Sequence, residues 1–306
     1  MKKISALEAY KASPYPSAKH TTYFDIYDKI FNEYQDKQIT FVEVGVLLGG
    51  SLFMWKNYFG DKARIIGIDL NPDAKKWEKD GFEIYIGSQS DPEFWKKFIS
   101  DVGPIDVFLD DGGHTYVKQI VTTENLLENI KDGGVLVVED THTSYMKGFG
   151  DTKISFINYV KVWIDIINSR FGAFTKLQKD YRVWSVEIFE SIVAFKINRK
   201  ASKLKSELTW NIQPSEDPKD YRNADKKHVR DNFSEIQSII KKAFSIYKDN
   251  KIYRILCTVL QQKYLKKFAI SMMNLRLSIT AKIRYVFGFL KRERIEINLW
   301  MKLLAC

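Results

Sequence analysis

Cysteine is scarce in this 306-residue chain, where only Cys257 and Cys306 occur. So few cysteines argue against a disulfide scaffold and against a thiolate zinc site, and they fit a reducing compartment. Long apolar runs are also missing: no stretch of about 18 uncharged apolar residues is present, so no membrane-spanning helix is expected. The first residues lack the apolar core of a signal peptide. We therefore expect a cytoplasmic protein.

Most of the chain also lacks an excess of positive charge. The net charge is +10, but residues 261–306 hold ten Lys or Arg against Glu293 and Glu296, a net of +8. The first 260 residues therefore carry only +2. Because the basic character belongs to the tail, it indicates no nucleic-acid partner for the rest of the chain.

Strand and helix patterns alternate through residue 170. The predicted strands are Ile39–Val44, Arg64–Leu70, Phe82–Ile86, Ile105–Leu109 and Val135–Val138. The predicted helices are Ser51–Tyr58, a helix capped by Asp91 that ends near Ser100, Tyr116–Ile130 and Lys153–Arg170. This alternation predicts an α/β fold, a Rossmann-like, doubly wound and mostly parallel sheet.

The pattern changes near residue 180. Two β-rich runs, Arg182–Phe189 and Ser191–Ile197, predict a hairpin that adds antiparallel strands at the edge of the sheet. Residues 211–220 are polar with two prolines, which is typical of a linker, and residues 229–306 have a helical pattern. We expect one domain at 1–200 and a helical, basic C-terminal extension at 201–306.

The extension contains an apolar stripe at helical spacing, surrounded by basic residues. The stripe comprises Leu265, Phe268, Met272, Leu275, Ile279, Ile283, Val286 and Leu290. A basic amphipathic helix of this kind can lie on the anionic inner face of a membrane. The alternative is a helix that packs on its own domain or on a partner subunit, as in a homo-oligomer. The sequence leaves both open.

A glycine-containing loop, Glu43 to Ser51, follows the first predicted strand. A dinucleotide fingerprint would be Gly-x-Gly-x-x-Gly from Gly45, but Leu47 stands at its middle glycine. That glycine lets the backbone approach a pyrophosphate, so its absence favours a nucleoside ligand without a diphosphate, such as S-adenosylmethionine. Asp69 ends the second strand, where it can accept hydrogen bonds from ribose hydroxyls. Alternatively, the glycines only serve a tight turn.

Two acidic clusters follow the fourth and fifth predicted strands. They are Asp110-Asp111-Gly112-Gly113-His114 and Glu139-Asp140. The carboxyl ends of parallel strands meet at one edge, so these carboxylates should converge, and they repel one another unless a cation or a proton lies between them. The clusters predict a hard divalent metal site, with oxygen ligands that favour Mg²⁺ or Mn²⁺ over zinc. Glu139-Asp140 could instead cap a helix.

Histidine chemistry is expected beside this metal site. His114 lies three residues past Asp111, and the ordinary pKa of histidine suits a general base near neutral pH. Its alternative is a histidine bonded to the local backbone, and His142 is the second candidate base. His20 and Tyr23 could line the mouth of the site or pack on the sheet.

These motifs resemble those of a known family. The pieces that carry the resemblance are Glu43-Val44-Gly45 with Gly49-Gly50-Ser51, Gly67-Ile68-Asp69, Gly87-Ser88-Gln89-Ser90-Asp91, Asp110 to His114, and Glu139 to Tyr145. Together they resemble the metal-dependent sugar O-methyltransferases of macrolide biosynthesis, such as the mycinamicin and macrocin enzymes. An N-terminal segment, Lys19 to Tyr23 with Tyr27, also resembles that family. The resemblance covers roughly residues 15–197.

The resemblance implies a role for each matching residue. Asp111, Glu139 and Asp140 would bind Mg²⁺, and His114 would be the general base beside Asp111. The residues implied in binding S-adenosylmethionine are Glu43, Gly45, Ser51, Asp69, Ser88, Gln89 and Asp110. The implied reaction moves a methyl group to a sugar or glycan hydroxyl in polysaccharide or glycoside biosynthesis. The rivals are a Rossmann-like oxidoreductase or hydroxylase-type relative, and a non-catalytic assembly protein that uses the basic tail.

Overall fold

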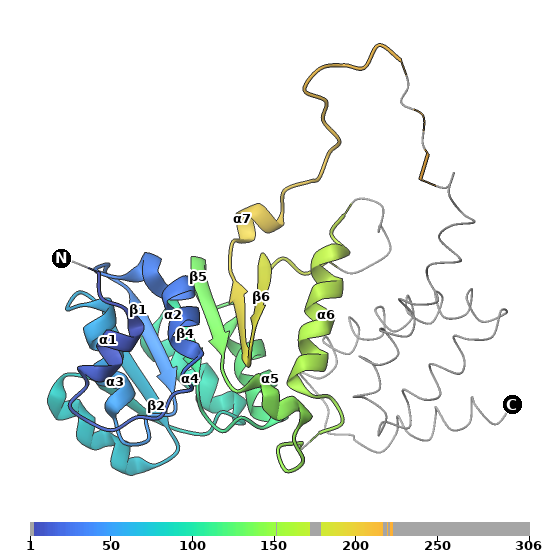
Figure 1. Ribbon diagram of the computed structural model, residues 1–306. Helices are drawn as coiled ribbons and strands as arrows, with labels where there is room; N and C mark the ends of the chain where they lie inside the picture. Colours follow the sequence, from blue (N-terminus) through green and yellow to red (C-terminus); the bar gives the residue numbers. More distant parts are fainter. Residues whose placement is uncertain (1–2, 151, 172–178, 217–218, 220, 223–306) are drawn as a thin grey trace, which may run out of the picture. The chain divides into compact units, whose positions relative to one another are not determined.

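The computed structural model describes residues 3–150, 152–171, 179–216, 219 and 221–222 (Figure 1). Its contacts divide the chain into one unit, Met1–Phe174 with Lys179–Lys205, and a second, Thr175–Gln178 with Ser206–Cys306. Every element below belongs to the first unit. The predicted helical extension and its apolar stripe lie almost entirely outside the described residues. Among the described helices, none has the length and apolar character to cross a membrane.

One sheet of seven strands organises the first unit, in the order β3-β2-β1-β4-β5-β7-β6. The strands are β1 (Thr40–Val44), β2 (Arg64–Asp69), β3 (Glu83–Ile86), β4 (Ile105–Asp110), β5 (Ile130–Val138), β6 (Ser185–Phe189) and β7 (Ile192–Lys196). Strands β1 to β5 pair in parallel, and β7 pairs antiparallel with both β5 and β6. The structure thus confirms the predicted mostly parallel sheet with an antiparallel terminal hairpin.

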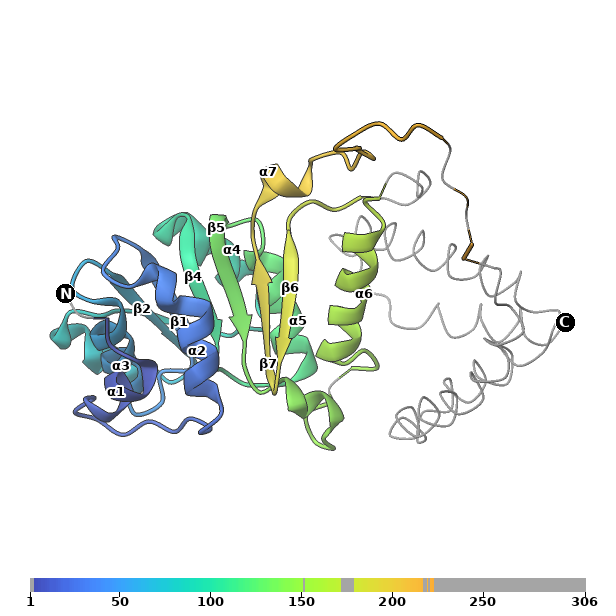
Figure 2. The ribbon, with the colours of Figure 1, turned by 45° about the horizontal axis from the view of Figure 1, so that its top comes forward.

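The helices cover both faces of this sheet (Figure 2). Their bounds are α1 (Ala6–Lys11), α2 (Tyr23–Phe31), η1 (Asn32–Tyr34), α3 (Gly50–Phe59), η2 (Pro72–Asp80), α4 (Pro92–Val102), α5 (Tyr116–Leu126), η3 (Thr141–Tyr145), α6 (Phe156–Asn168) and α7 (Arg199–Ser202). Helices α1, α2 and α3 pack on one face, and α4, α5 and α6 pack on the other.

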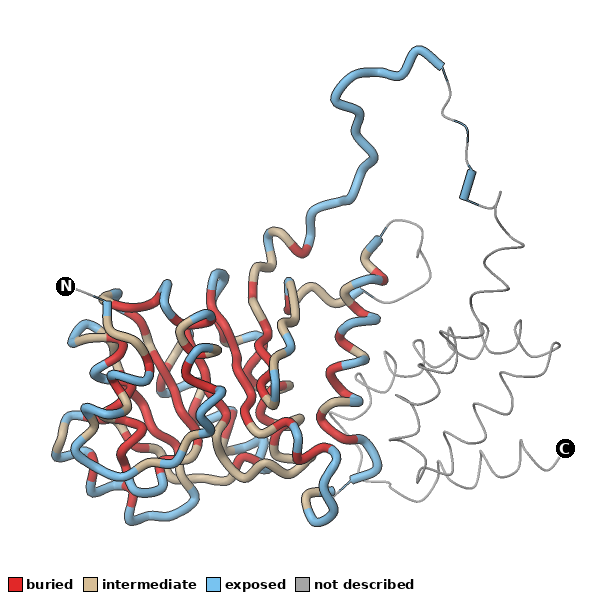
Figure 3. Tube along the Cα trace, in the orientation of Figure 1, coloured by how far each residue is buried: buried red, intermediate tan, exposed pale blue. Residues whose placement is uncertain are grey.

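The central strands are apolar on both sides because both faces carry helices. Successive residues alternate between the two cores: Phe41 packs with Trp55 on the α3 side, and Val42 packs with Trp95 on the α4 side. Figure 3 shows these strands as buried trace. Trp55 is fully buried in this core.

Two predicted helices were wrong at their ends. The helix expected at Tyr116–Ile130 stops at Leu126, because a turn at Asn129 leads directly into β5 at Ile130. The helix expected to begin at Lys153 begins at Phe156, where the Ser155 side chain caps it. By contrast, Asp91 caps α4 as predicted, since its carboxylate accepts from the Glu93 amide at 2.9 Å.

The segment before α2 is held against the glycine-containing loop. The Ser13 hydroxyl donates to the Gly50 carbonyl at 2.8 Å. A Cβ at Gly50 would lie 2.3 Å from the Tyr15 carbonyl oxygen, so only glycine permits this contact. Farther along this segment, Ala18, Lys19 and His20, together with Tyr23 at the start of α2, line the cavity at the carboxyl edge of the sheet.

Candidate active site

A cavity of about 710 Å³ opens at the carboxyl ends of β1, β2, β4 and β5. Open α/β sheets bind their ligands at this edge. The lining includes four of the predicted cofactor residues, which are Gly45, Asp69, Ser88 and Gln89. It also includes all of the predicted metal ligands and His114. The sequence motifs therefore meet in one place, as expected.

Gly45 lets two strand ends approach closely. Its φ is +96°, and a Cβ there would lie 2.1 Å from the carbonyl oxygen of Asp111. No side chain fits in that space, and L-residues also adopt this φ only with strain. The glycine is therefore required by the packing of β1 against the loop after β4, in addition to any contact with a ligand.

Replacing Gly45 with Ala should destabilise the protein by more than the roughly 1–3 kcal/mol that a strained backbone costs alone, because the Cβ would also collide with the Asp111 carbonyl. Thermal unfolding measures this loss. The matched control is Gly81→Ala, since Gly81 has a φ of +88° but nothing within 4 Å of its virtual Cβ. The control should show only the cost of the left-handed backbone. Equal losses at the two glycines would contradict the proposed steric role of Gly45.

Asp69 holds the glycine-containing loop in shape. Its Oδ2 accepts from the amides of Val46 at 2.9 Å and Leu47 at 3.0 Å, and its Oδ1 accepts from the Asn71 amide at 2.8 Å. Leu47 has a positive φ of 46°, and 72% of its surface is exposed at the cavity. The predicted ribose contact of Asp69 stays a prediction, while its role in ordering the loop is visible.

Three predicted cofactor residues lie behind the cavity wall. Glu43 is fully buried and accepts from the Ser51 hydroxyl at 2.6 Å and from the Trp55 indole at 2.9 Å. Burial raises the pKa of Glu43 to about 7, although nearby positive charge opposes the shift. Asp110 accepts from the Gln89 amide at 2.6 Å, and burial raises its pKa to about 6. These residues support the wall, and their predicted contacts with a cofactor remain predictions.

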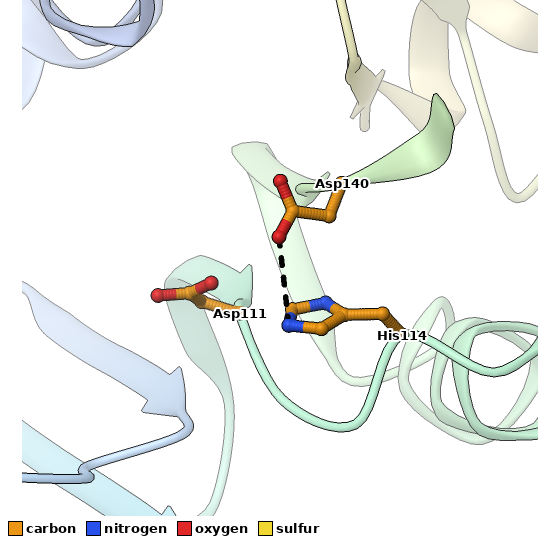
Figure 4. Close-up of side chains that lie close together, drawn as sticks. All are labelled: Asp111, His114 and Asp140. Carbon is orange, nitrogen blue, oxygen red and sulfur yellow. Dashed lines mark ion pairs between the residues drawn. The ribbon is translucent and has the colours of Figure 1, made fainter. Parts of the chain in front are cut away.

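Asp111, His114 and Asp140 form the group best placed to hold a metal ion (Figure 4). Each offers one ligand atom, and these atoms lie within 4.8 Å of one another. His114 Nε2 is 3.5 Å from Asp140 Oδ2. His114 and Asp140 both have positive φ, of 52° and 55°. Strained backbone of this kind is typical of functional sites, where surrounding contacts hold it in place.

Only one nitrogen of the His114 ring is available to a ligand in the cavity. Nδ1 is buried without a hydrogen-bond partner among the described residues, whereas Nε2 faces Asp140. The Thr143 hydroxyl donates to the His114 carbonyl at 2.9 Å and fixes the backbone. Proton uptake from a bound acceptor would therefore occur at Nε2, and the predicted role as general base stays a prediction.

Lys19 lies in the centre of the acidic cluster, and our sequence analysis missed it as a site residue. Its ammonium is 2.6 Å from Asp111 Oδ2, 3.2 Å from Glu139 Oε2 and 3.6 Å from Glu43 Oε1. Its side chain is 1% exposed. The cation that clustered carboxylates require is thus supplied in part by the chain itself. The available signal was its position in the N-terminal segment that resembles the family.

Glu139 contacts Lys19 and is not one of the three residues of the metal-binding group. Its Oε1 accepts from the Tyr27 hydroxyl, and both of its oxygens lie within hydrogen-bonding distance of the Lys19 ammonium. Burial and the neighbouring Asp111 carboxylate raise the pKa of Glu139, against the effect of Lys19. The predicted ligand role of Glu139 is untested, but its oxygens already have partners.

Three histidines surround Asp140. Besides His114, the nearest ring nitrogens of His20 and His142 each lie 4.0 Å from Asp140 Oδ1. The Tyr23 hydroxyl donates to the same oxygen. His20 and Tyr23 line the cavity, which agrees with the first of their two interpretations. His142 is exposed and bonds to Ser191, so it is less well placed than His114 to serve the cavity.

A family model described as a methyltransferase domain matches residues 42–141. The match begins in β1, ends just past Asp140, and includes both acidic clusters. Residues 42–141 are therefore similar to a methyltransferase domain. The match agrees with the methyltransferase that the sequence motifs indicated.

Curated relatives of this domain are named as O-methyltransferases. The chain is 32% identical over 156 residues to the 8-demethyl-8-alpha-L-rhamnosyl tetracenomycin-C 2'-O-methyltransferase of Streptomyces olivaceus, covering 47% of this chain and 40% of the relative. It is 33% identical over 131 residues to the mycinamicin VI 2''-O-methyltransferase of Micromonospora griseorubida, covering 40% and 32%. The chain spans less than half the length of these relatives.

A solved structure has the same fold. The domain is similar to MycE, a methyltransferase from the mycinamicin biosynthetic pathway solved in complex with Mg and SAH. The TM-score is 0.57 at 24% sequence identity, covering 68% of this chain and 58% of that one. At this identity the likeness shows the fold, and it confirms the predicted Rossmann-like class.

Proposed function

We propose that this methyltransferase domain transfers a methyl group from S-adenosylmethionine to a sugar hydroxyl, in a divalent-metal-dependent reaction. The observation that carries the proposal is the single cavity wall that joins the glycine-containing loop to Asp111, His114 and Asp140. The names of the relatives support a sugar acceptor. A pathway that builds polysaccharides or glycosides is part of the same proposal.

The cavity fits a nucleoside cofactor. Gly45 and Gly112 line the cavity, and Cβ atoms there would lie within 2.2 Å of Asp111 or Gln89 atoms, so the loops after β1 and β4 pack closely where they line it. Asp69, Ser88 and Gln89 supply polar atoms along its wall. Bound there, S-adenosylmethionine would supply the sulfonium methyl group.

The donor set fits a hard divalent cation. Asp111 and Asp140 offer carboxylate oxygens beside the cavity, which suits Mg²⁺ or Mn²⁺. A cation held by these residues would lower the pKa of an acceptor hydroxyl that it binds. The chain's own contribution is to hold both carboxylates in place, by Lys19 at Asp111 and by the Tyr23 hydroxyl at Asp140.

His114 is proposed to take the acceptor proton at Nε2. As the hydroxyl oxygen forms its bond to the methyl carbon, the carbon–sulfur bond breaks and the proton moves to the imidazole. Asp140 Oδ2, 3.5 Å away, stabilises the imidazolium that results. Much of the acceleration is expected from holding donor and acceptor together in the same cavity.

The proposed reaction is tested by incubating the protein with isotopically labelled S-adenosylmethionine, Mg²⁺ and a panel of nucleotide sugars and glycans. Mass spectrometry should find the labelled methyl group on one sugar hydroxyl. A protein that binds S-adenosylhomocysteine yet labels no hydroxyl acceptor, and instead labels nitrogen or carbon, would contradict O-methylation.

Cofactor choice separates the proposal from an oxidoreductase. Calorimetry should show binding of S-adenosylhomocysteine and little binding of NAD, because Leu47 replaces the glycine that admits a pyrophosphate. Asp69→Ala should weaken S-adenosylhomocysteine binding by roughly 1.5–3 kcal/mol, as expected when a charged hydrogen-bonding partner is lost. Asp73→Ala, on the exposed surface of η2, is the matched control and should have no effect. Tight NAD binding would rule out the methyltransferase reaction.

A further inference from the structure

The Lys19 side chain is buried among negative charges. Its ammonium contacts the carboxylates of Asp111, Glu139 and Glu43 at 2.6–3.6 Å, and it lies 5.7 Å from the centre of the Tyr27 ring. Three carboxylates at these distances stabilise the charged form of the side chain. The lysine therefore carries a permanent positive charge.

The neighbouring acidic residues Glu139 and Asp140 contact different partners. The Glu139 carboxylate accepts hydrogen bonds from Lys19 and Tyr27. The Asp140 carboxylate accepts one from Tyr23 and lies close to His114. Asp111 lies between them: its Oδ2 contacts Lys19, and the residue also belongs to the group that can hold a metal ion. The acidic cluster thus contains the Lys19 ammonium next to the position proposed for a divalent metal ion.

We propose, on the basis of the proposed function, that Lys19 is a positioning residue that acts as a permanent cation of the acidic cluster. It contacts Glu139 and Asp111 and lowers the affinity of the cluster for a divalent ion. Like charges close together disfavour each other, and this repulsion is strong where water is excluded. Loss of the ammonium should leave a more negative cluster that binds a divalent cation more tightly.

A purely structural role for Lys19 has different consequences. If the side chain only packs the N-terminal segment against Tyr27 and Trp55, its removal should lower stability and leave the metal affinity unchanged or weaker. If it acts through charge, its removal should lower the stability of the metal-free protein and raise the metal affinity. The two effects are measured without any assay of activity.

The test uses the full chain with Lys19→Met, a substitution that keeps most of the side-chain volume. Mn²⁺ binding is measured by calorimetry, and the Tm is measured with and without Mn²⁺. We expect binding at least about tenfold tighter than wild type, because a unit charge a few ångströms away is removed. The metal-free Tm should fall by several degrees, and Mn²⁺ should raise it more than in wild type. Lys29→Met, an exposed lysine of α2, should change neither quantity.

A charge-balanced double variant sharpens the test. Lys19→Met with Glu139→Gln removes one charge of each sign, so both the metal-free Tm and the Mn²⁺ affinity should return toward wild type. If Lys19→Met does not fold, Lys19→Gln retains hydrogen bonding without the charge and should show the same gain in affinity. Unchanged or weaker Mn²⁺ binding in the neutral variants would overturn the proposal.

The outcome also separates this inference from the proposed function. If wild type binds no Mn²⁺ but the neutral variants do, Lys19 displaces the metal, and the metal-dependent reaction is wrong while the role of Lys19 stands. If neither binds Mn²⁺, the proposed role fails together with the metal site. Tighter binding in the variants without any labelled product would leave the inference intact and count against the methyl transfer alone.

Discussion

Replacing His114 with Ala is expected to slow methyl transfer by about 10²–10⁴-fold, the usual contribution of a general base. The reason is that Nε2 is the ring nitrogen that faces the cavity, 3.5 Å from the Asp140 carboxylate, while Nδ1 is buried. The measurement is a single-turnover rate with saturating S-adenosylmethionine. Binding of S-adenosylhomocysteine should change little, because the glycine-containing loop is untouched.

The same variant distinguishes a base from a metal ligand. His114 shares the metal-binding group with Asp111 and Asp140, so it could serve either role. If His114 is the base, the Mn²⁺ affinity of His114→Ala should stay within about threefold of wild type. Loss of Mn²⁺ binding in His114→Ala would instead identify His114 as a metal ligand. His142→Ala is the matched control, and a larger loss of rate there than at His114 would move the base to His142.

The layered fold could be predicted because its signals are local. Apolar runs such as Ile105–Leu109 are short, continuous and followed by acidic residues, which is typical of buried parallel strands. The ends of the helices were harder to predict. Ile130 fits the helical pattern that begins at Tyr116, but it pairs with Ile105 in the sheet. That pairing depends on contacts across the sheet, which periodicity does not contain.

The sequence could predict that the site residues lie close together, because the order of the strands in a parallel sheet decides which strand ends are neighbours. Asp111 follows β4 and Asp140 follows β5, so a parallel sheet places them side by side. Lys19 could not be found in this way, since it reaches Asp111 across 92 residues of sequence. Its role depends on how α1 and the segment after it pack on Gly50, which no motif spacing reveals.

The partner of Glu139 could not be predicted from the sequence. Clustered carboxylates predict a cation, but their repulsion does not decide which cation each carboxylate contacts. Glu139 and Asp140 are neighbours in sequence, yet Asp140 has a positive φ of 55°, and the chain turns sharply there. Glu139 therefore contacts Lys19, while Asp140 lies near His114, and both residues line the cavity.

Replacing Asp140 with Asn should abolish both Mn²⁺ binding and methyl transfer, the largest loss expected in this protein. Asn keeps the size of the side chain and can still accept the hydrogen bond from Tyr23, so the fold should survive. What disappears is the carboxylate charge that a hard divalent cation requires and that stabilises an imidazolium at His114. Calorimetry with Mn²⁺, the rate with added Mg²⁺, and the Tm measure these three consequences separately.

Two comparisons make the Asp140 result decisive. Asp101→Asn removes a carboxylate of α4 that pairs with Lys97 outside the cavity, and it should leave Mn²⁺ binding and rate unchanged. Excess chelator should reduce wild type to the rate of Asp140→Asn, and Mg²⁺ should restore wild type alone. Full activity in chelator would remove the metal from the reaction. If Asp140→Asn instead keeps Mn²⁺ binding but loses activity, Asp140 is not a metal ligand. Its role would then be to orient His114 as the base.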